Sequence, residues 1–156
     1  MPIPTRLVDF LDRNDIHYEV MRHAAAYTAQ ELAAAEHVKG RYHAKVVVVK
    51  SGVDCLLAVV PADHRVNLDR LSRLVGRPVE LTEEAEFDRI FPDCARGTMP
   101  PFGALYNLPT VVDRALTFDP YIVFEAGTHT EAIKMEYADF ARLAKPRVGE
   151  FAEKLH

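Results

Sequence analysis

Three stretches of the chain combine residue types that can act on an ester or bind an anion. Lys45 opens an apolar run that continues as four valines, residues 97–103 hold glycines and prolines in close succession, and Gly127-Thr128-His129 forms a polar turn. An ammonium at a strand end can hold a phosphate or stabilise negative charge that develops on an ester. Glycines let the backbone approach a ligand, prolines fix a loop in one shape, and an imidazole can orient water or an amino group. We take these stretches as the candidate site.

Each stretch also has an ordinary structural interpretation. Lys45 could snorkel from a strand edge, Phe102 could fill the core beneath a rigid connection, and His129 could be a solvent-exposed histidine. Cys94, beside the loop, is a further candidate nucleophile, although no His/Asp partnership for it is evident in the sequence. The residues alone leave these alternatives open.

Several reaction classes lack their motifs. The chain has no phosphate-binding GxxxxGK[ST] loop, no GxGxxG after a strand, no HExxH helix and no GxSxG elbow. The seven histidines occur singly, and Cys55 and Cys94 match neither a disulfide framework nor a zinc-ligand spacing. We therefore expect no metal, no cofactor and no disulfide.

Length and charge limit the partners. A chain of 156 residues has the size of one domain, and we expect one domain over residues 1–156. The N-terminus lacks a signal-peptide pattern and the apolar runs are too short to span a bilayer, which predicts a cytoplasmic protein without membrane contact. The net charge of −4 argues against nonspecific coating of nucleic acid. A local cationic cluster, which could also be solvated strand ends, lies between Glu36 and Asp54: Lys39, Arg41, Lys45 and Lys50.

The order and spacing of the three stretches resemble the YbaK/prolyl-tRNA-synthetase-associated editing family. The resemblance extends from about Pro4 to Leu143 and implies a domain that acts on aminoacyl-tRNA in trans or as an insertion in prolyl-tRNA synthetase. Its motifs are His43-Ala44-Lys45 with the four valines, Gly97-Thr98-Met99-Pro100-Pro101-Phe102-Gly103, Glu125-Ala126-Gly127-Thr128-His129, and His23 ahead of Tyr27-Thr28.

The resemblance implies a role for each part of the candidate site. Lys45, Gly127 and His129 are the expected catalytic residues. An aminoacyl ester is already activated, so backbone N–H groups and Lys45 would suffice to stabilise the oxyanion without a catalytic triad. The expected substrate-binding residues are His23, Tyr27, Thr28, Arg41, Gly97, Met99, Pro100, Pro101, Phe102, Gly103 and Thr128.

The expected function is therefore that of a trans-editing aminoacyl-tRNA deacylase, which removes a small amino acid from tRNA-Pro or a similar tRNA. Val46 stands after Lys45 where some members have a polar residue, so alanine, serine, cysteine and non-protein amino acids all stay open. The expected partners are the acceptor end of aminoacyl-tRNA and a synthetase, with the oligomeric state open. The alternatives are a non-catalytic module that binds tRNA ends or a synthetase, and a small-ester or thioester hydrolase that uses Cys94.

Hydrophobic periodicity and turn residues predict the elements that position these residues. The pattern favours an α/β or α+β fold with a mixed, largely antiparallel sheet packed by helices, and it places Lys45 on a strand. Helices are expected at about 4–14, 28–36, 67–75, 82–91 and 137–143. Strands are expected at 17–21, 44–49, 53–60, 79–81, 110–112, 121–126 and 132–135, with 93–107 as an ordered loop.

Overall fold

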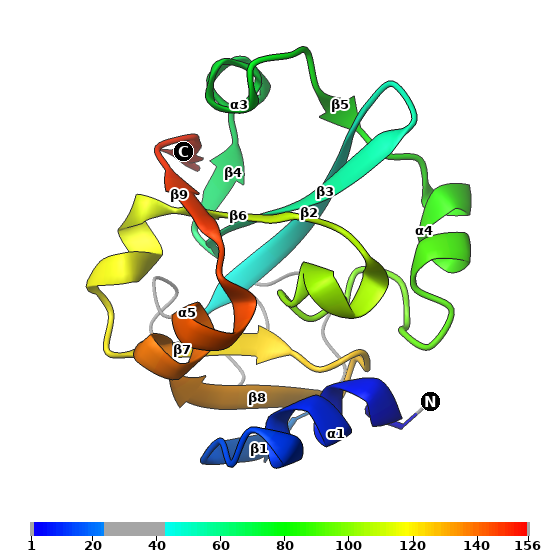
Figure 1. Ribbon diagram of the computed structural model, residues 1–156, viewed down its shortest axis with the longest axis vertical. Coiled ribbons are helices and arrows are strands. Elements are labelled where there is room, and N and C mark those ends of the chain that lie inside the picture. Colours follow the sequence, from blue (N-terminus) through cyan, green and yellow to red (C-terminus); the bar gives the residue numbers. More distant parts are fainter. Residues whose placement is uncertain (1, 24–42, 156) are drawn as a thin grey trace.

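The strands of the described part of the chain form two sheets and a short ribbon (Figure 1). The computed structural model describes residues 2–23 and 43–155. The larger sheet is mixed and has the order β5-β2-β3-β6-β9, with β2–β3 and β2–β5 antiparallel and β3–β6 and β6–β9 parallel. Its strands are β2 (Ala44–Ser51), β3 (Asp54–Pro61), β5 (Glu80–Leu81), β6 (Thr110–Asp113) and β9 (Arg147–Gly149).

The smaller sheet is antiparallel, and an isolated bridge joins it to the larger one. It has the order β1-β8-β7, from β1 (Tyr18–Arg22), β8 (Glu131–Glu136) and β7 (Tyr121–Glu125). A parallel bridge between His43 and Val123 brings the start of β2 against β7. The ribbon pairs β4 (His64–Val66) with β10 (Ala152–Lys154) in antiparallel fashion.

The β2–β3 hairpin is the centre of the larger sheet because its two strands are rich in β-branched and apolar residues. Six of the eight residues of β3 are buried. Gly52, with φ of 63°, supplies the left-handed backbone that the tight turn requires. The register places Lys45 opposite Val60, near the end of the hairpin away from this turn.

The helices pack around the sheets, and α3 carries a clear signal at each end. The Asn67 side chain caps α3 by accepting the Arg70 backbone N–H at 3.0 Å, and Gly76 ends this helix with φ of 82°. Among residues 2–23 and 43–155, the α-helices are α1 (Thr5–Arg13), α3 (Leu68–Val75), α4 (Glu84–Ile90) and α5 (Tyr137–Ala144), and the 3₁₀ helices are η1 (Gly103–Tyr106) and η2 (Arg114–Phe118).

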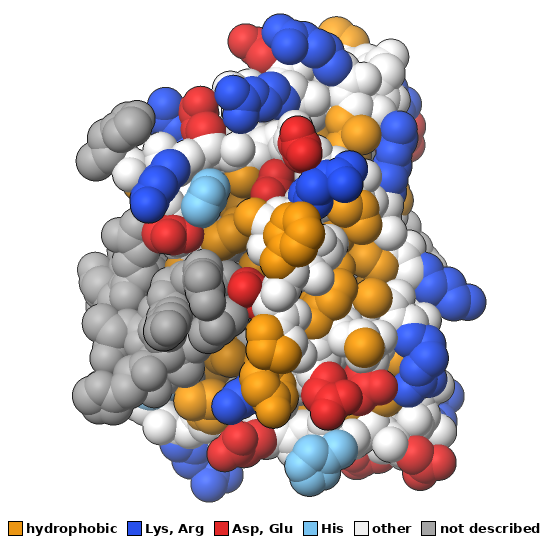
Figure 2. All heavy atoms as spheres, turned by 90° about the vertical axis from the view of Figure 1, so that its left-hand side faces the viewer, with side chains coloured by type: hydrophobic (Ala, Val, Ile, Leu, Met, Phe, Trp, Pro, Cys, Tyr) orange, Lys and Arg blue, Asp and Glu red, His pale blue; other side chains and the backbone are white. Residues whose placement is uncertain are grey.

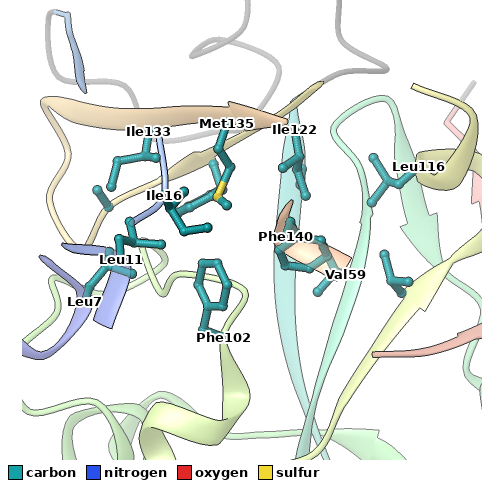
Figure 3. Close-up of a cluster of buried hydrophobic side chains, with 14 residues drawn as sticks. Leu7, Leu11, Ile16, Val59, Phe102, Leu116, Ile122, Ile133, Met135 and Phe140 are labelled. Carbon is teal, nitrogen blue, oxygen red and sulfur yellow. The ribbon is translucent and has the colours of Figure 1, made fainter. Parts of the chain in front are cut away.

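The main core joins α1, the smaller sheet and the loop of residues 97–103, which we call the Gly/Pro loop. Phe102 is 1% exposed and lies among Leu7, Leu11 and Phe140 (Figure 3). Its ring makes edge contacts with Phe10, Phe124 and Phe140 at centroid distances of 5.4–5.7 Å. Such offset aromatic contacts add to the stability gained by burial. The packing of Phe102 in the core therefore fixes the position of the loop that contains it.

The expected α/β fold with mixed and largely antiparallel pairing is confirmed, and several details differ from expectation, among them β4, which was not expected. The strands divide into two sheets and a ribbon instead of one sheet. The chain continues past α5 into β9 and β10, which are too short to give a periodic signal. The helix expected at 82–91 begins at Glu84, with Glu83 as its N-terminal flanking residue, and Thr82 is buried ahead of it. The helix expected at 28–36 lies outside the described residues.

Within the described residues, no helix is both long enough and apolar enough to cross a membrane.

Candidate functional site

Lys45 is held at the start of β2 by a contact with the β3–β4 turn. Its side chain is half-buried, and its Nζ donates a hydrogen bond to the backbone carbonyl of His64 at 2.5 Å. Burial lowers the pKa of this ammonium, and the charge of Asp63 works in the opposite direction. A partly desolvated cation of this kind interacts more strongly with an anion than one in bulk water does.

The turn that meets Lys45 carries an acid–imidazole pair. Asp63 Oδ1 lies 2.7 Å from His64 Nδ1, and both side chains are partly exposed. A carboxylate at Nδ1 fixes the ring orientation and directs Nε2 away from the acid. Neither residue was expected in the site. The only sequence signal was an Asp-His dipeptide directly after an apolar strand.

The Gly/Pro loop and the Gly127 turn lie against each other, as two reciprocal backbone bonds show. The Gly127 N–H donates to the Thr98 carbonyl at 2.9 Å, and the Ala95 N–H donates to the Gly127 carbonyl at 2.9 Å. The N–H of His23 donates to the Thr130 carbonyl at 3.0 Å, which brings the end of β1 to the same turn. Three segments that are far apart in sequence therefore meet here.

The backbone amides of two candidate glycines are used within the fold. The Gly127 N–H is bonded to Thr98, and the buried Gly103 N–H donates to Thr110 Oγ1 at 3.0 Å. Gly103 has no space for a side chain, because a Cβ there would meet the Leu108 carbonyl oxygen and Thr110 Oγ1. These two amides therefore close the loop and the turn, and the Gly103 amide, which by its residue type could have donated to a ligand, donates to Thr110 instead.

The side chains of the Gly/Pro loop are mostly internal. Met99 and Phe102 are 4% and 1% exposed, and each belongs to a hydrophobic cluster. Pro100 and Pro101 are also buried, whereas Gly97 is exposed with φ of 81° and open space around its Cα. Phe102 therefore lies in the core, as the packing interpretation predicts. Because Met99 and Phe102 are both buried in hydrophobic clusters, they do not present an open lining for an amino-acid pocket.

The remaining candidates are distributed around the Gly127 turn. Thr128 is buried, and its Oγ1 accepts the Thr130 N–H at 3.3 Å. His129 and His23 are half-buried. The candidates Tyr27, Thr28 and Arg41 lie outside the described residues, as does most of the cationic cluster before Lys45.

The structure does not bring all the candidates into one set of contacts. For the part of the chain that is described, the Lys45 ammonium bonds to the β3–β4 turn, whereas the Gly/Pro loop bonds to the Gly127 turn. The two groups of contacts are connected by the bridge between His43, which precedes β2 in the larger sheet, and Val123 of β7 in the smaller sheet.

Cys94 is a poor nucleophile in its folded environment. Its Sγ lies 3.3 Å from the Tyr106 hydroxyl, which also donates to Asp93 Oδ1 at 3.0 Å. Burial is the largest cause that raises the pKa of the Cys94 thiol to about 11. Because the thiolate is the reactive form, this environment argues against a hydrolase that uses Cys94.

We predict that Cys94 resists alkylation in the native protein. A rise of its pKa from 9.0 to about 11 reduces the thiolate fraction at neutral pH roughly a hundredfold, and burial excludes the reagent as well. Iodoacetamide labelling followed by peptide mass analysis should show slow modification of Cys94 in native protein and rapid modification in urea. Fast native labelling of Cys94 that abolishes activity would restore the thiol mechanism.

Charged groups on one face of the protein are mixed in sign. On the face shown in Figure 2, basic and acidic side chains are interspersed around hydrophobic side chains in the middle. This arrangement agrees with the net charge of −4. Any contact with a polyanion is therefore expected to be local.

Comparison with known proteins defines the class. Residues 23–143 match the family of the aminoacyl-tRNA editing domain. The chain belongs to this family and is an aminoacyl-tRNA deacylase, which is an ester hydrolase. The resemblance seen in the three motifs is thus confirmed.

Particular relatives cover nearly the whole chain. The chain is 29% identical to the multifunctional Ser/Thr-tRNA deacylase ProXp-y of Escherichia coli strain K12, over 94% of this chain and 90% of that protein. A solved structure of a candidate trans-editing enzyme for prolyl-tRNA synthetase superposes with a TM-score of 0.85 at 25% identity, covering 98% of each chain. The hypothetical protein APE2540 has the same fold, with a TM-score of 0.86 at 20% identity, covering 95% of this chain and 99% of that one.

Proposed function

We propose that this protein edits in trans: it hydrolyses the ester of a mischarged tRNA that carries a small amino acid, with tRNA-Pro or a similar tRNA as the carrier. The family supplies the reaction class. The observation that carries the proposal is the half-buried ammonium of Lys45, held at a strand end beside the polar Asp63-His64 turn. A cation fixed in this way can stabilise the oxyanion that forms when the ester carbonyl is attacked.

In the proposed reaction, water attacks the carbonyl carbon and gives up a proton, and the negative charge moves to the carbonyl oxygen. Collapse of this intermediate breaks the bond to the ribose oxygen, which takes up a proton, and releases the amino acid. Lys45 stabilises the charged oxygen, while the Gly127 turn and the Gly/Pro loop form the opposite wall and His129 orients the nucleophile or the amino group. In this arrangement the reciprocal bonds between Gly127, Thr98 and Ala95 keep that wall rigid.

We place serine and threonine first among the amino acids to be tested, followed by alanine, cysteine and non-protein analogues. The relative in Escherichia coli is named for activity on Ser- and Thr-tRNA. Discrimination would follow the second-sieve principle, in which a pocket admits residues that are small enough and excludes the cognate one.

A panel of tRNAs that carry different amino acids tests this proposal. The expected result is release of one or a few small amino acids at rates well above spontaneous hydrolysis, with cognate prolyl-tRNA left intact. Tight binding without release from any tRNA of the panel would favour the alternative, a non-catalytic module that binds tRNA ends or a synthetase.

We predict that the deacylation rate declines at a lower alkaline pH than it would if Lys45 had the pKa of an ordinary lysine. The protonated amine is the required form, and its pKa is lowered by burial, so protonation is lost below the usual lysine value of about 10.4. The measurement is the single-turnover rate against pH, after subtraction of uncatalysed ester hydrolysis. The Lys45→Arg variant is the control, because its guanidinium stays charged and its low residual rate should show no such decline. A parental rate that stays level through this range would contradict the assignment.

A further inference from the structure

The β4–β10 ribbon has two faces that differ in charge. On one face Arg65 pairs with Glu153 at 2.7 Å, and Asn67 also donates to Glu153, at 3.2 Å. Directly opposed residues of an antiparallel pair share a face, so His64 and its partner Lys154 lie together on the other face. The charge of the first face is largely neutralised by ion pairing, whereas the second face presents an exposed lysine beside an imidazole.

Lys45 contacts the ribbon where β4 begins. The Lys45 ammonium is bonded to the His64 carbonyl, and it interacts electrostatically with Asp63, whose carboxylate also holds His64 Nδ1. The Leu155 N–H donates to the Asp63 carbonyl at 3.0 Å, which ties the end of β10 to the same turn. Lys45, His64 and Lys154 are thus gathered around one short turn whose acid is Asp63.

We propose that His64 and Lys154 form a subsite for a phosphodiester group of the RNA acceptor end, next to the ester that Lys45 serves. The inference rests on the proposed function and adds the place where the RNA backbone is held. The contact of Nδ1 with Asp63 fixes the imidazole so that Nε2 lies on the side of the ring away from the acid, where it can donate to a phosphate oxygen when it carries a proton. Lys154 contributes a flexible point charge suited to the same anion.

An acid–imidazole pair can also serve as a general base in ester hydrolysis. A base has no need of a neighbouring cation, whereas a phosphate site does. The cross-strand position of Lys154 therefore favours anion binding. The two roles differ in the kinetic quantity that they affect, so one experiment separates them.

The experiment measures single-turnover deacylation of mischarged tRNA and of 3′-aminoacyl-adenosine, which carries the same ester without a phosphodiester. The variants are Lys154→Ala and His64→Asn, and the matched control is Arg65→Ala, which removes the cation of the opposite face. With tRNA, each variant should raise the half-saturating protein concentration about tenfold and leave the saturating rate unchanged. The log–log salt slope should fall in magnitude by about 0.7 to 1 per lost contact.

With aminoacyl-adenosine the variants should match the parent, and Arg65→Ala should match the parent with both substrates. Equal effects on both substrates, or no effect with tRNA, would overturn the subsite. A fall in the saturating rate of His64→Asn would identify a general base instead. If the parent hydrolyses no substrate, the proposed function fails, and the subsite is then tested by the affinity for uncharged tRNA, which Lys154→Ala should weaken about tenfold.

Discussion

Replacement of Lys45 by alanine is expected to reduce single-turnover deacylation by about a hundredfold or more. Loss of one group that stabilises the developing oxyanion typically has an effect of this size. The fold should persist, because the substitution removes one hydrogen bond to the His64 carbonyl but also a cation that is costly to desolvate. Amino-acid release from a mischarged tRNA measures the first effect, and a thermal melt measures the second.

Two further variants make this prediction specific. Lys45→Arg should recover little activity, because a planar guanidinium cannot occupy the position of a compact ammonium. Lys50→Ala is the matched control on the same strand: Lys50 pairs with Glu86 at 3.0 Å, and its odd spacing from Lys45 places it on the opposite face of β2. Its removal should leave the rate unchanged. Parental activity in a well-folded Lys45→Ala variant would remove the main support for the proposed mechanism.

Replacement of Gly127 by alanine is expected to destabilise the protein by about 2–4 kcal/mol, which combines a left-handed backbone penalty with overpacking. Gly127 has φ of 83°, and a Cβ there would lie 2.5 Å from Pro4 Cδ and 2.7 Å from Pro4 Cγ. The turn would have to move away from α1, and its bonds to Thr98 and Ala95 would be disturbed. Urea unfolding gives the loss of stability, and deacylation should decline with it.

Gly76→Ala is the control, because Gly76 has φ of 82° at the end of α3 but nothing lies within 4 Å of the point that a Cβ would occupy there. It should show only the backbone penalty, about 1–2 kcal/mol. Adding Pro4→Ala to Gly127→Ala should recover part of the difference, since alanine lacks the two ring carbons that Cβ would meet. If Gly127→Ala and Gly76→Ala were equally destabilised, packing against Pro4 would not be the reason for glycine at 127.

The sequence was sufficient for most of the elements, because their signals are local. Asn67 and Gly76 mark the ends of α3 through hydrogen-bonding and backbone preferences that act within a few residues. The valine run and the Gly52 turn likewise predict the hairpin that carries Lys45. The motif order was also sufficient for the family, because it is a property of the chain and requires no knowledge of contacts.

Tertiary structure decided how the candidate residues are used. The amides of Gly103 and Gly127 could have faced a ligand by their residue type, but their partners, Thr110 and Thr98, follow from packing between segments distant in sequence or across a loop. Phe102 became a core residue because α1 and α5 converge on it. The Asp63-His64 turn joined Lys45 only because β3 returns alongside β2, and Lys154 reached His64 only through the pairing of β10 with β4. Such long-range pairings depend on the sum of many weak burial and hydrogen-bond terms, which no local pattern records.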